Sequence, residues 1–202
     1  MYHLLPVRRL LTLFATLHLG LLLLVVSIFN SNSSLLGFLR YSSGILFALD
    51  VVVLIVSVSA WRWFWKRIPQ LSNLYFPDLN GIWQGNIKFE TNTGELRALE
   101  AKVRIKQNLW SIQLDLCSET SKSSTLVAYP GEELGNKVLY YIYQNVPKNP
   151  KHNEYKGTSL LSVDITSASS RLNGHYYTVR GTRGRIELKR ISPDPNQPYE
   201  LY

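Results

Sequence analysis

Tyrosine, threonine and arginine residues in the C-terminal half of the sequence are the side chains best suited to ligand chemistry. Aromatic rings stack on nucleobases, at about 1–3 kcal/mol per base, and guanidinium groups bind phosphate through paired hydrogen bonds. The sequence therefore predicts a site for a ligand that carries bases and phosphates. The residues assigned to it are Tyr141, Tyr143, Thr158, Tyr176, Thr178, Arg180 and Arg183. The alternative is that the tyrosines only pack a protein interior and the cations are solvated.

The sequence lacks the common signals of catalysis and of metal binding. From residue 78 onward the histidines are His152 and His175, and the chain has one cysteine, Cys117. There is no H-E-x-x-H motif, no Cys–His metal spacing, no phosphate-binding glycine loop and no nucleophile elbow. We therefore expect a binding protein that is not an enzyme, with no catalytic residue, no metal and no cofactor.

Short β-strands must position the ligand-binding candidates. From Asp78 onward, apolar and polar residues alternate with the period of two that is typical of half-buried strands. The clearest segment places Val103 and Ile105 on one face and Arg104 and Lys106 on the other. The predicted strands are Gly81–Glu90, Arg97–Gln107, Leu109–Cys117, Thr125–Tyr129, Lys137–Asn145, Lys156–Thr166, Leu172–Arg180 and Arg183–Ile191.

Eight antiparallel strands with one apolar face predict an all-β domain, an up-and-down β-barrel of the lipocalin-like kind. Closure removes exposed strand edges and leaves room for one small ligand. A two-sheet sandwich is the alternative. The opening Gly81-x-Trp83 resembles the first strand of lipocalin-like barrels, in which the Trp closes one end, so we expect Trp83, with Trp110, to fill the closed end, which we call the floor. The ligand candidates then lie at the opposite end, the mouth, below the basic connection Val146–Tyr155.

Two long apolar segments precede the strands. The segment Leu10–Phe29 contains no formally charged residue, and a second, which we place at residues 44–65, ends among tryptophans and cations. About 20 apolar helical residues span a bilayer. The segments therefore predict a hairpin of two transmembrane α-helices, with a cleaved signal peptide as the alternative. The hairpin is flanked by Arg8, Arg9, Arg62, Lys66 and Arg67 and its connection holds only Arg40, which predicts that both termini are cytoplasmic.

His18 and Asp50 are the ionisable residues of interest inside the predicted spans. Such groups are costly at membrane depth and usually face a partner or a watery cavity. An antiparallel hairpin brings the two to broadly similar depth, so a contact between them is expected. We assign them a role in the membrane or in oligomer assembly. The alternatives are a simple contact within the helix pair, or an Asp50 drawn toward the outer interface.

The charge distribution agrees with a division into a hairpin and a barrel. The net charge is +8, but residues 78–202 hold 16 Lys and Arg against 13 Asp and Glu. A protein that binds nucleic acid would have a more uniformly basic surface, so we expect no DNA or RNA partner. A single cysteine excludes an internal disulfide, which fits the cytoplasm. The predicted organisation is a hairpin at 1–67, a linker at 68–77, a barrel at 78–191 and a disordered tail at 192–202.

This arrangement resembles the two-transmembrane β-barrel effectors of CBASS, the cyclic-oligonucleotide-based antiphage systems of bacteria. The resemblance is carried by the two apolar segments and by the strand opening Leu79-Asn80-Gly81-x-Trp83-x-Gly85. It implies that a partner nucleotidyltransferase makes a cyclic dinucleotide, which the barrel binds. It further implies that the protein then oligomerises in the bacterial inner membrane and that the hairpins disrupt the bilayer, which kills the infected cell.

Two other functional classes fit the same pattern. A membrane-anchored, lipocalin-like binder of a small hydrophobic ligand would have an apolar mouth and no role for Arg180 or Arg183. A barrel that serves as a protein-docking module would have an interior filled by its own side chains.

Overall fold

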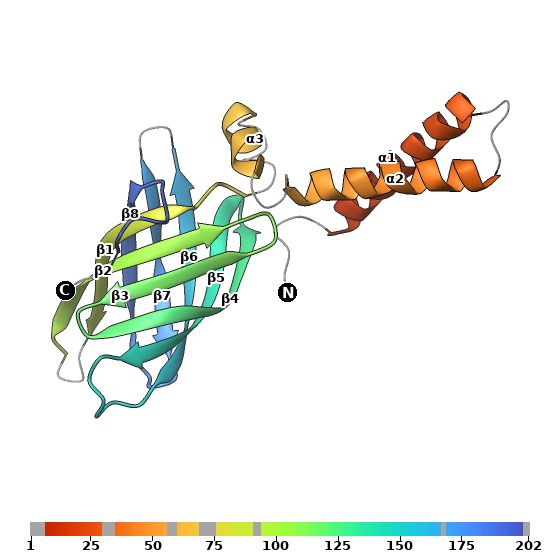
Figure 1. The fold of residues 1–202 in the computed structure, drawn as a ribbon. Coiled ribbons are helices and arrows are strands. Elements are labelled where there is room, and N and C mark those ends of the chain that lie inside the picture. Colours follow the sequence, from red (N-terminus) through yellow and green to blue (C-terminus); the bar gives the residue numbers. More distant parts are fainter. Residues whose placement is uncertain are drawn as a thin grey trace.

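A computed structural model of the chain describes residues 7–29, 35–55, 60–68, 76–90, 94–166 and 169–199. Within these residues, three helices are followed by eight strands, and the first two helices project away from the strands (Figure 1). The described residues thus divide into a helical N-terminal part and an all-β part.

The helical part consists of α1 (Val7–Phe29), α2 (Leu35–Ile55) and the short α3 (Trp61–Arg67). Helix α2 begins at Leu35 rather than at residue 44, because Leu35, Leu36, Phe38 and Leu39 extend its apolar sequence. The predicted second span also includes residues 56–59, which lie outside the described residues. None of the helices in the described ranges has both the length and the apolar character that crossing a membrane requires.

The strands form one closed barrel in which each strand pairs with the next and β1 pairs with β8, all antiparallel. This closure confirms the up-and-down barrel and excludes the sandwich. The strand bounds are β1 Gly81–Glu90, β2 Leu96–Gln107, β3 Ile112–Ser118, β4 Ser121–Glu133, β5 Asn136–Pro147, β6 Tyr155–Ile165, β7 Ser170–Thr178 and β8 Arg183–Ser192.

Trp83 fills the floor of the barrel, as predicted. Its side chain is fully buried, and its indole N–H donates a hydrogen bond of 2.9 Å to the carbonyl of Leu79. Gly81 starts the strand at a φ of 135°, and a Cβ at this position would lie 2.0 Å from the carbonyl oxygen of Ser192. Only a glycine allows the ends of β1 and β8 to approach so closely next to the indole.

The expectation that Trp110 also fills the floor is wrong. The side-chain oxygen of Asn108 accepts hydrogen bonds of 2.8 Å from the backbone N–H groups of Trp110 and Ser111. This turn delays the start of β3 to Ile112, so Trp110 lies outside the strand and exposes 40% of its surface.

The structure describes the first residues of the segment predicted as a disordered tail, as far as residue 199. Ser192 is the last residue of β8, and the carbonyl of Pro193 accepts a hydrogen bond of 3.0 Å from Arg62 of α3. The guanidinium of Arg104 lies 4.3 Å from the ring centroid of Tyr199. Contacts with cationic side chains therefore hold the start of the tail. At the other end of the barrel domain, Phe76 of the predicted linker is buried in the core.

Candidate functional site

A cavity of about 240 Å³ opens at the mouth of the barrel, where β2, β4, β6 and β8 begin. This is the end away from α3 (Figure 1). Inward-facing residues from all eight strands and from two of the mouth turns line it: Ile87, Phe89, Leu99, Leu116, Ser118, Thr120, Ser121, Ser123, Tyr141, Tyr143, Asn145, Tyr155, Tyr176, Thr178, Thr182 and Ile186. The prediction that the barrel interior would be open at this end is therefore correct.

Four tyrosines dominate the cavity wall. Tyr141 and Tyr143 alternate along β5 and their rings stack, with centroids 5.2 Å apart and planes 27° apart. Tyr176 of β7 and Tyr155 at the start of β6 complete the group. Burial raises the pKa of Tyr141 and Tyr143 well above the usual value and that of Tyr176 to about 12. The cavity therefore offers neutral rings and neutral hydroxyl groups at physiological pH.

A polar group also reaches into the cavity from β5. The amide nitrogen of Asn145 donates a hydrogen bond of 3.0 Å to the hydroxyl of Ser121. Its amide oxygen is buried and has no hydrogen-bond partner within the described part of the chain. Because an unpaired buried acceptor is costly, this oxygen is a candidate acceptor for an amino or hydroxyl group of a ligand.

Arg180 lies on the rim, in the turn between β7 and β8. Its guanidinium is 4.2 Å from the centroid of the Tyr155 ring and donates a hydrogen bond to the carbonyl of Asn153. Arg180 thus bridges two mouth loops, residues 148–154 and 179–182. It is in a turn rather than in the predicted strand because β7 ends at Thr178, where Gly181 with a φ of 80° reverses the chain.

Two of the predicted ligand residues lie on the outside of the barrel and do not face the cavity. Thr158 is exposed on the outside of β6, because its neighbours Gly157 and Ser159 are the buried, inward residues of that strand. Arg183 is exposed and lines a separate outer hollow with Tyr177 and Lys88. The structure therefore brings together Tyr141, Tyr143, Tyr176 and Thr178 in the cavity, with Arg180 at its rim.

Several cavity residues were missed by sequence reasoning. Asn145 continues the inward alternation of Tyr141 and Tyr143 by one step, a signal that was available. Ser121 and Ser123 escaped because β4 was predicted to begin only at Thr125. The register of β4 shifts between Thr125 and Val127, which interrupts the alternation that defines a strand.

The cavity combines a neutral interior with a rim of mixed charge. None of the residues that line it is Lys, Arg, Asp or Glu, whereas Arg180, Lys148 and Lys151 lie on or beside the mouth loops together with Glu119 and Glu154. No group of three or more potential metal ligands occurs among the described His, Cys, Asp and Glu residues. The arrangement can hold flat, uncharged ring systems inside and an anionic group beside Arg180 at the entrance.

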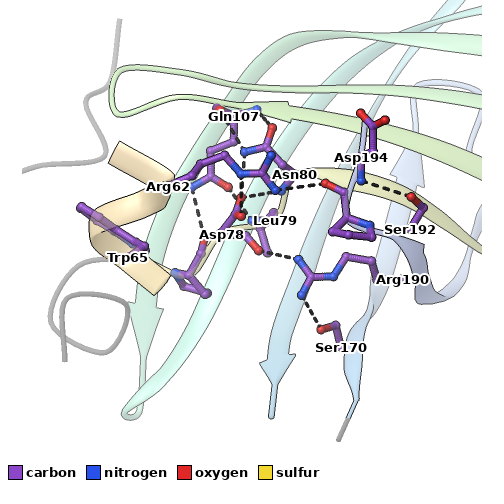
Figure 2. A network of polar contacts seen from close by, with 12 residues as sticks. Arg62, Trp65, Asp78, Leu79, Asn80, Gln107, Ser170, Arg190, Ser192 and Asp194 are labelled. Carbon is purple, nitrogen blue, oxygen red and sulfur yellow. Dashed lines mark hydrogen bonds and ion pairs between the residues drawn. The ribbon is translucent and has the colours of Figure 1, made fainter. Parts of the chain in front are cut away.

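A polar network ties the floor of the barrel to α3 (Figure 2). The carboxylate of Asp78 forms an ion pair of 2.9 Å with Arg62 of α3 and accepts hydrogen bonds from Asn80. Arg190 of β8 donates to the Asp78 carbonyl at 2.8 Å and to the Ser170 hydroxyl at 2.9 Å. Burial lowers the pKa of Arg190, and the neighbouring Asp78 opposes this effect.

Two amide side chains complete the floor. Gln107 accepts from the Leu79 N–H at 2.7 Å, and Asn80 both accepts from the Gln107 N–H at 2.8 Å and donates to the Gln107 carbonyl at 3.0 Å. Arg190 also lies 5.5 Å from the centroid of the Trp83 ring. The entry of the chain into β1 is therefore fixed by side chains from β2, β8 and α3.

The predicted contact between the two long helices is present. The Nε2 atom of His18 in α1 lies 3.3 Å from the Oδ1 atom of Asp50 in α2. The geometry is that of a polar contact within the helix pair; a role in the membrane or in oligomer assembly stays a prediction.

The comparisons with known proteins identify the barrel. Residues 74–190, more than half of the chain, match the family described as Cap15, cyclic dinucleotide receptor domain. CD-NTase-associated protein 15 of Staphylococcus schleiferi is 27% identical over 153 residues, which cover 71% of this chain and 80% of that protein. The chain therefore belongs to the Cap15 family of CBASS effectors, and its barrel is the cyclic dinucleotide receptor domain of that family.

Proposed function

We propose that the mouth cavity binds a cyclic dinucleotide made by a partner nucleotidyltransferase, and that binding makes the protein oligomerise and disrupt the bacterial inner membrane. The observation that carries the proposal is the combination, in a barrel of this family, of a tyrosine-lined neutral cavity with an arginine on its rim. No catalytic step is required of the chain.

The cavity interior suits the bases of such a ligand. The stacked rings of Tyr141 and Tyr143 and the ring of Tyr176 offer flat apolar surfaces. Stacking of this kind tolerates any base, because every base has a π-face. The buried oxygen of Asn145 adds one acceptor, which favours a base that presents an amino group.

The rim suits the phosphates. Arg180 holds a guanidinium at the entrance, and this group can turn from the Asn153 carbonyl to a phosphate oxygen. Hydrogen bonds to charged groups contribute about 1.5–3 kcal/mol each. A ligand that places its bases inside the cavity and its phosphates at the entrance avoids burying unpaired charge.

The volume of the cavity indicates that binding includes movement of the rim. About 240 Å³ is below the roughly 300–1,000 Å³ of pockets for drug-sized ligands. A dinucleotide therefore needs the Arg180 bridge between the mouth loops to open, so that one base enters and the rest of the ring occupies the entrance. Opening of this bridge is a ligand-dependent change that could be relayed to the rest of the barrel.

We assign the output to the N-terminal helices. The apolar sequences of 10–29 and 44–61, the basic flanks and the exposed Trp63 support a location in the inner membrane, with both termini in the cytoplasm. His18 and Asp50 form the polar contact within the helix pair. Leakage of dye from vesicles of bacterial lipid, with and without ligand, measures this output, and unchanged leakage by Asp50→Leu would remove the polar contact from the mechanism.

The binding test is calorimetry of the full-length protein in detergent against a panel of cyclic dinucleotides that differ in base and linkage. The informative pair of variants is Arg180→Ala and Arg183→Ala, two arginines three positions apart, of which the second faces outward. We expect Arg180→Ala to weaken binding about 10- to 100-fold and Arg183→Ala to bind as the wild type does.

Three results would contradict the proposal. Failure to bind every member of the panel would overturn the receptor function. Equal loss in both arginine variants would indicate general charge attraction instead of a rim contact. Tight binding of an uncharged hydrophobic ligand, unaffected by Arg180→Ala, would favour the lipocalin-like alternative.

A further inference from the structure

The outside of the barrel has an uncharged face on β4–β7. Outward-facing residues there form two rows of cross-strand neighbours. One row runs through Tyr129, Tyr140, Leu160 and His175, and the other through Val127, Ile142, Thr158 and Tyr177. We call these eight residues the β4–β7 face.

The β4–β7 face is apolar and open to solvent. Its six aromatic and aliphatic residues each expose between 37% and 56% of their surface. The rings of Tyr129 and Tyr140 lie 6.1 Å apart, and the Tyr140 hydroxyl donates a hydrogen bond to Glu133 beside the face. None of the eight residues is Lys, Arg, Asp or Glu.

The outward side of β8, β1, β2 and β3 is different. It carries the ion pairs Lys88–Glu187 and Arg104–Asp115, both at 2.8 Å, and a Gln84–Glu100 hydrogen bond. Such charged surface is depleted from the centre of protein interfaces, whereas tyrosine is enriched there. The two sides of one barrel thus differ in the way that an interface differs from free surface.

We propose that the β4–β7 face is the surface through which two copies of this chain associate side by side. This rests on the proposed function in one respect, because oligomerisation is part of it. In a two-fold symmetric contact the same patch meets itself, and a face without charge does not repel a second copy. A lateral contact also leaves the mouth free for a ligand and the floor free for α3.

The size of the face fits a regulated contact. Its eight side chains expose on the order of 600 Å² per copy, so a pair buries on the order of 1,200 Å², the lower end for specific interfaces. An interface of this size is weak by itself and is sensitive to small rearrangements of its strands.

The face and the cavity share strands. On β5, Tyr141 and Tyr143 point into the cavity, whereas Tyr140 and Ile142 point outward. On β7, Tyr176 points inward and Tyr177 outward. A ligand that moves the inward tyrosines therefore acts on backbone that also positions the face, which gives ligand binding a short route to association.

The test is sedimentation of the full-length protein in detergent, with and without the cyclic dinucleotide that binds most tightly in calorimetry. The face variants are Tyr177→Arg and Ile142→Arg, and the matched control is Gln113→Arg, which adds the same charge to an exposed outward position on β3. Melting temperatures within a few degrees of the wild type identify variants that are folded, and Tyr177→Phe is the conservative variant.

We expect the wild type, Gln113→Arg and Tyr177→Phe to form dimers when ligand is added. Both face variants should need at least tenfold more protein to dimerise while binding the ligand with unchanged affinity. Dimerisation of the face variants at wild-type concentrations would overturn the inference. So would a loss of vesicle binding with self-association intact, since the face would then contact lipid.

Failure of this inference is distinguishable from failure of the proposed function. If ligand binds but the wild type stays monomeric, the β4–β7 interface is wrong and the receptor function stands. If no ligand binds, sedimentation over rising protein concentration still tests the face. Dimers that the face variants lack would support the interface without the receptor, and a monomer at every concentration would overturn it.

Discussion

The two ends of the barrel are built from the same strands, but the floor is filled by side chains and the mouth is hollow. At the floor, Trp83 fills the interior, and Asp78, Asn80, Gln107 and Arg190 pair with one another and with backbone groups. At the mouth the interior is hollow, and the Asn145 oxygen lacks a partner within the described residues. Side-chain packing and hydrogen bonding are therefore concentrated where the chain enters the barrel, whereas the binding end keeps an open cavity.

The strongest test of this contrast is removal of the floor side chain. Trp83→Ala leaves a cavity below β1 and an unpaired Leu79 carbonyl, and should lower the free energy of unfolding by about 3–5 kcal/mol. Denaturant unfolding followed by circular dichroism measures the loss. A cost below 1 kcal/mol would show that the floor does not hold the barrel together.

The next largest effect should come from the floor network. Arg190→Ala removes the hydrogen bonds to the Asp78 carbonyl and to Ser170, and should lower the free energy of unfolding by about 1.5–3 kcal/mol. Lys189→Ala, at the neighbouring exposed position, is the matched control and should stay within about 0.5 kcal/mol of the wild type. Equal effects in the two variants would assign the loss to β8 in general and not to the network.

Alkaline pH should lower the free energy of unfolding through the buried tyrosines of the mouth. Burial raises the pKa of Tyr176 to about 12 and those of Tyr141 and Tyr143 further, whereas an unfolded tyrosine has a pKa of about 10. The folded chain thus keeps protons that the unfolded chain releases. The stability that these groups confer is fully present below pH 10 and is lost as the pH rises from 10 toward 12 and beyond.

Unfolding by urea at pH 8 and at pH 11 measures this loss. Tyr143→Phe should reduce it, because the variant has one fewer buried hydroxyl at the mouth, whereas Trp83→Phe at the floor should leave the pH dependence unchanged. If the mouth tyrosines ionise with a pKa near 10 in the folded chain, their environment is wetter than described.

The smallest expected effect has the opposite sign. The Ser159 hydroxyl is buried between Tyr141 and Tyr176 and has no hydrogen-bond partner among the described residues. Ser159→Ala removes an unsatisfied polar group and should raise the free energy of unfolding by about 1 kcal/mol. A decrease would mean that this hydroxyl is satisfied in solution, and so that the mouth is more complete than its hydrogen bonds indicate.

The sequence predicted the regular parts of the barrel well. Period-two alternation located at least part of each strand, and the predicted bounds of β1 agree with the observed ones because Gly81 and the residues after Glu90 delimit it. Trp83 at the floor followed from the resemblance of Gly81-x-Trp83 to the opening strand of lipocalin-like barrels. Tyr141, Tyr143 and Tyr176 followed from their alternation on strands with one buried face.

The errors arose where local geometry interrupts the alternation. The register shift between Thr125 and Val127 concealed most of β4 and with it Ser121 and Ser123. Thr158 was assigned to the wrong face because the inward residue beside it is Gly157, which has no side chain to mark the face. A Cβ at Gly157 would lie 2.3 Å from the Tyr143 hydroxyl oxygen, so the tyrosine ring occupies the space that a side chain would have filled. This contact between Gly157 of β6 and Tyr143 of β5 depends on the tertiary structure, so the residue pattern of a single strand does not predict it.

The pairing of β1 with β8 places Ile82 opposite Ser192 and so joins the eighth strand of the barrel to the first. During translation, α1 and α2 leave the ribosome before any strand, and β8 follows the other seven. The strand β1 cannot form its pairing with β8 until β8 has been synthesised. Arg190, which covers Trp83, also arrives with β8. The newly made chain therefore carries its helices before it has a finished receptor, and a chain that stalls before residue 183 would present those helices with a barrel that has not closed.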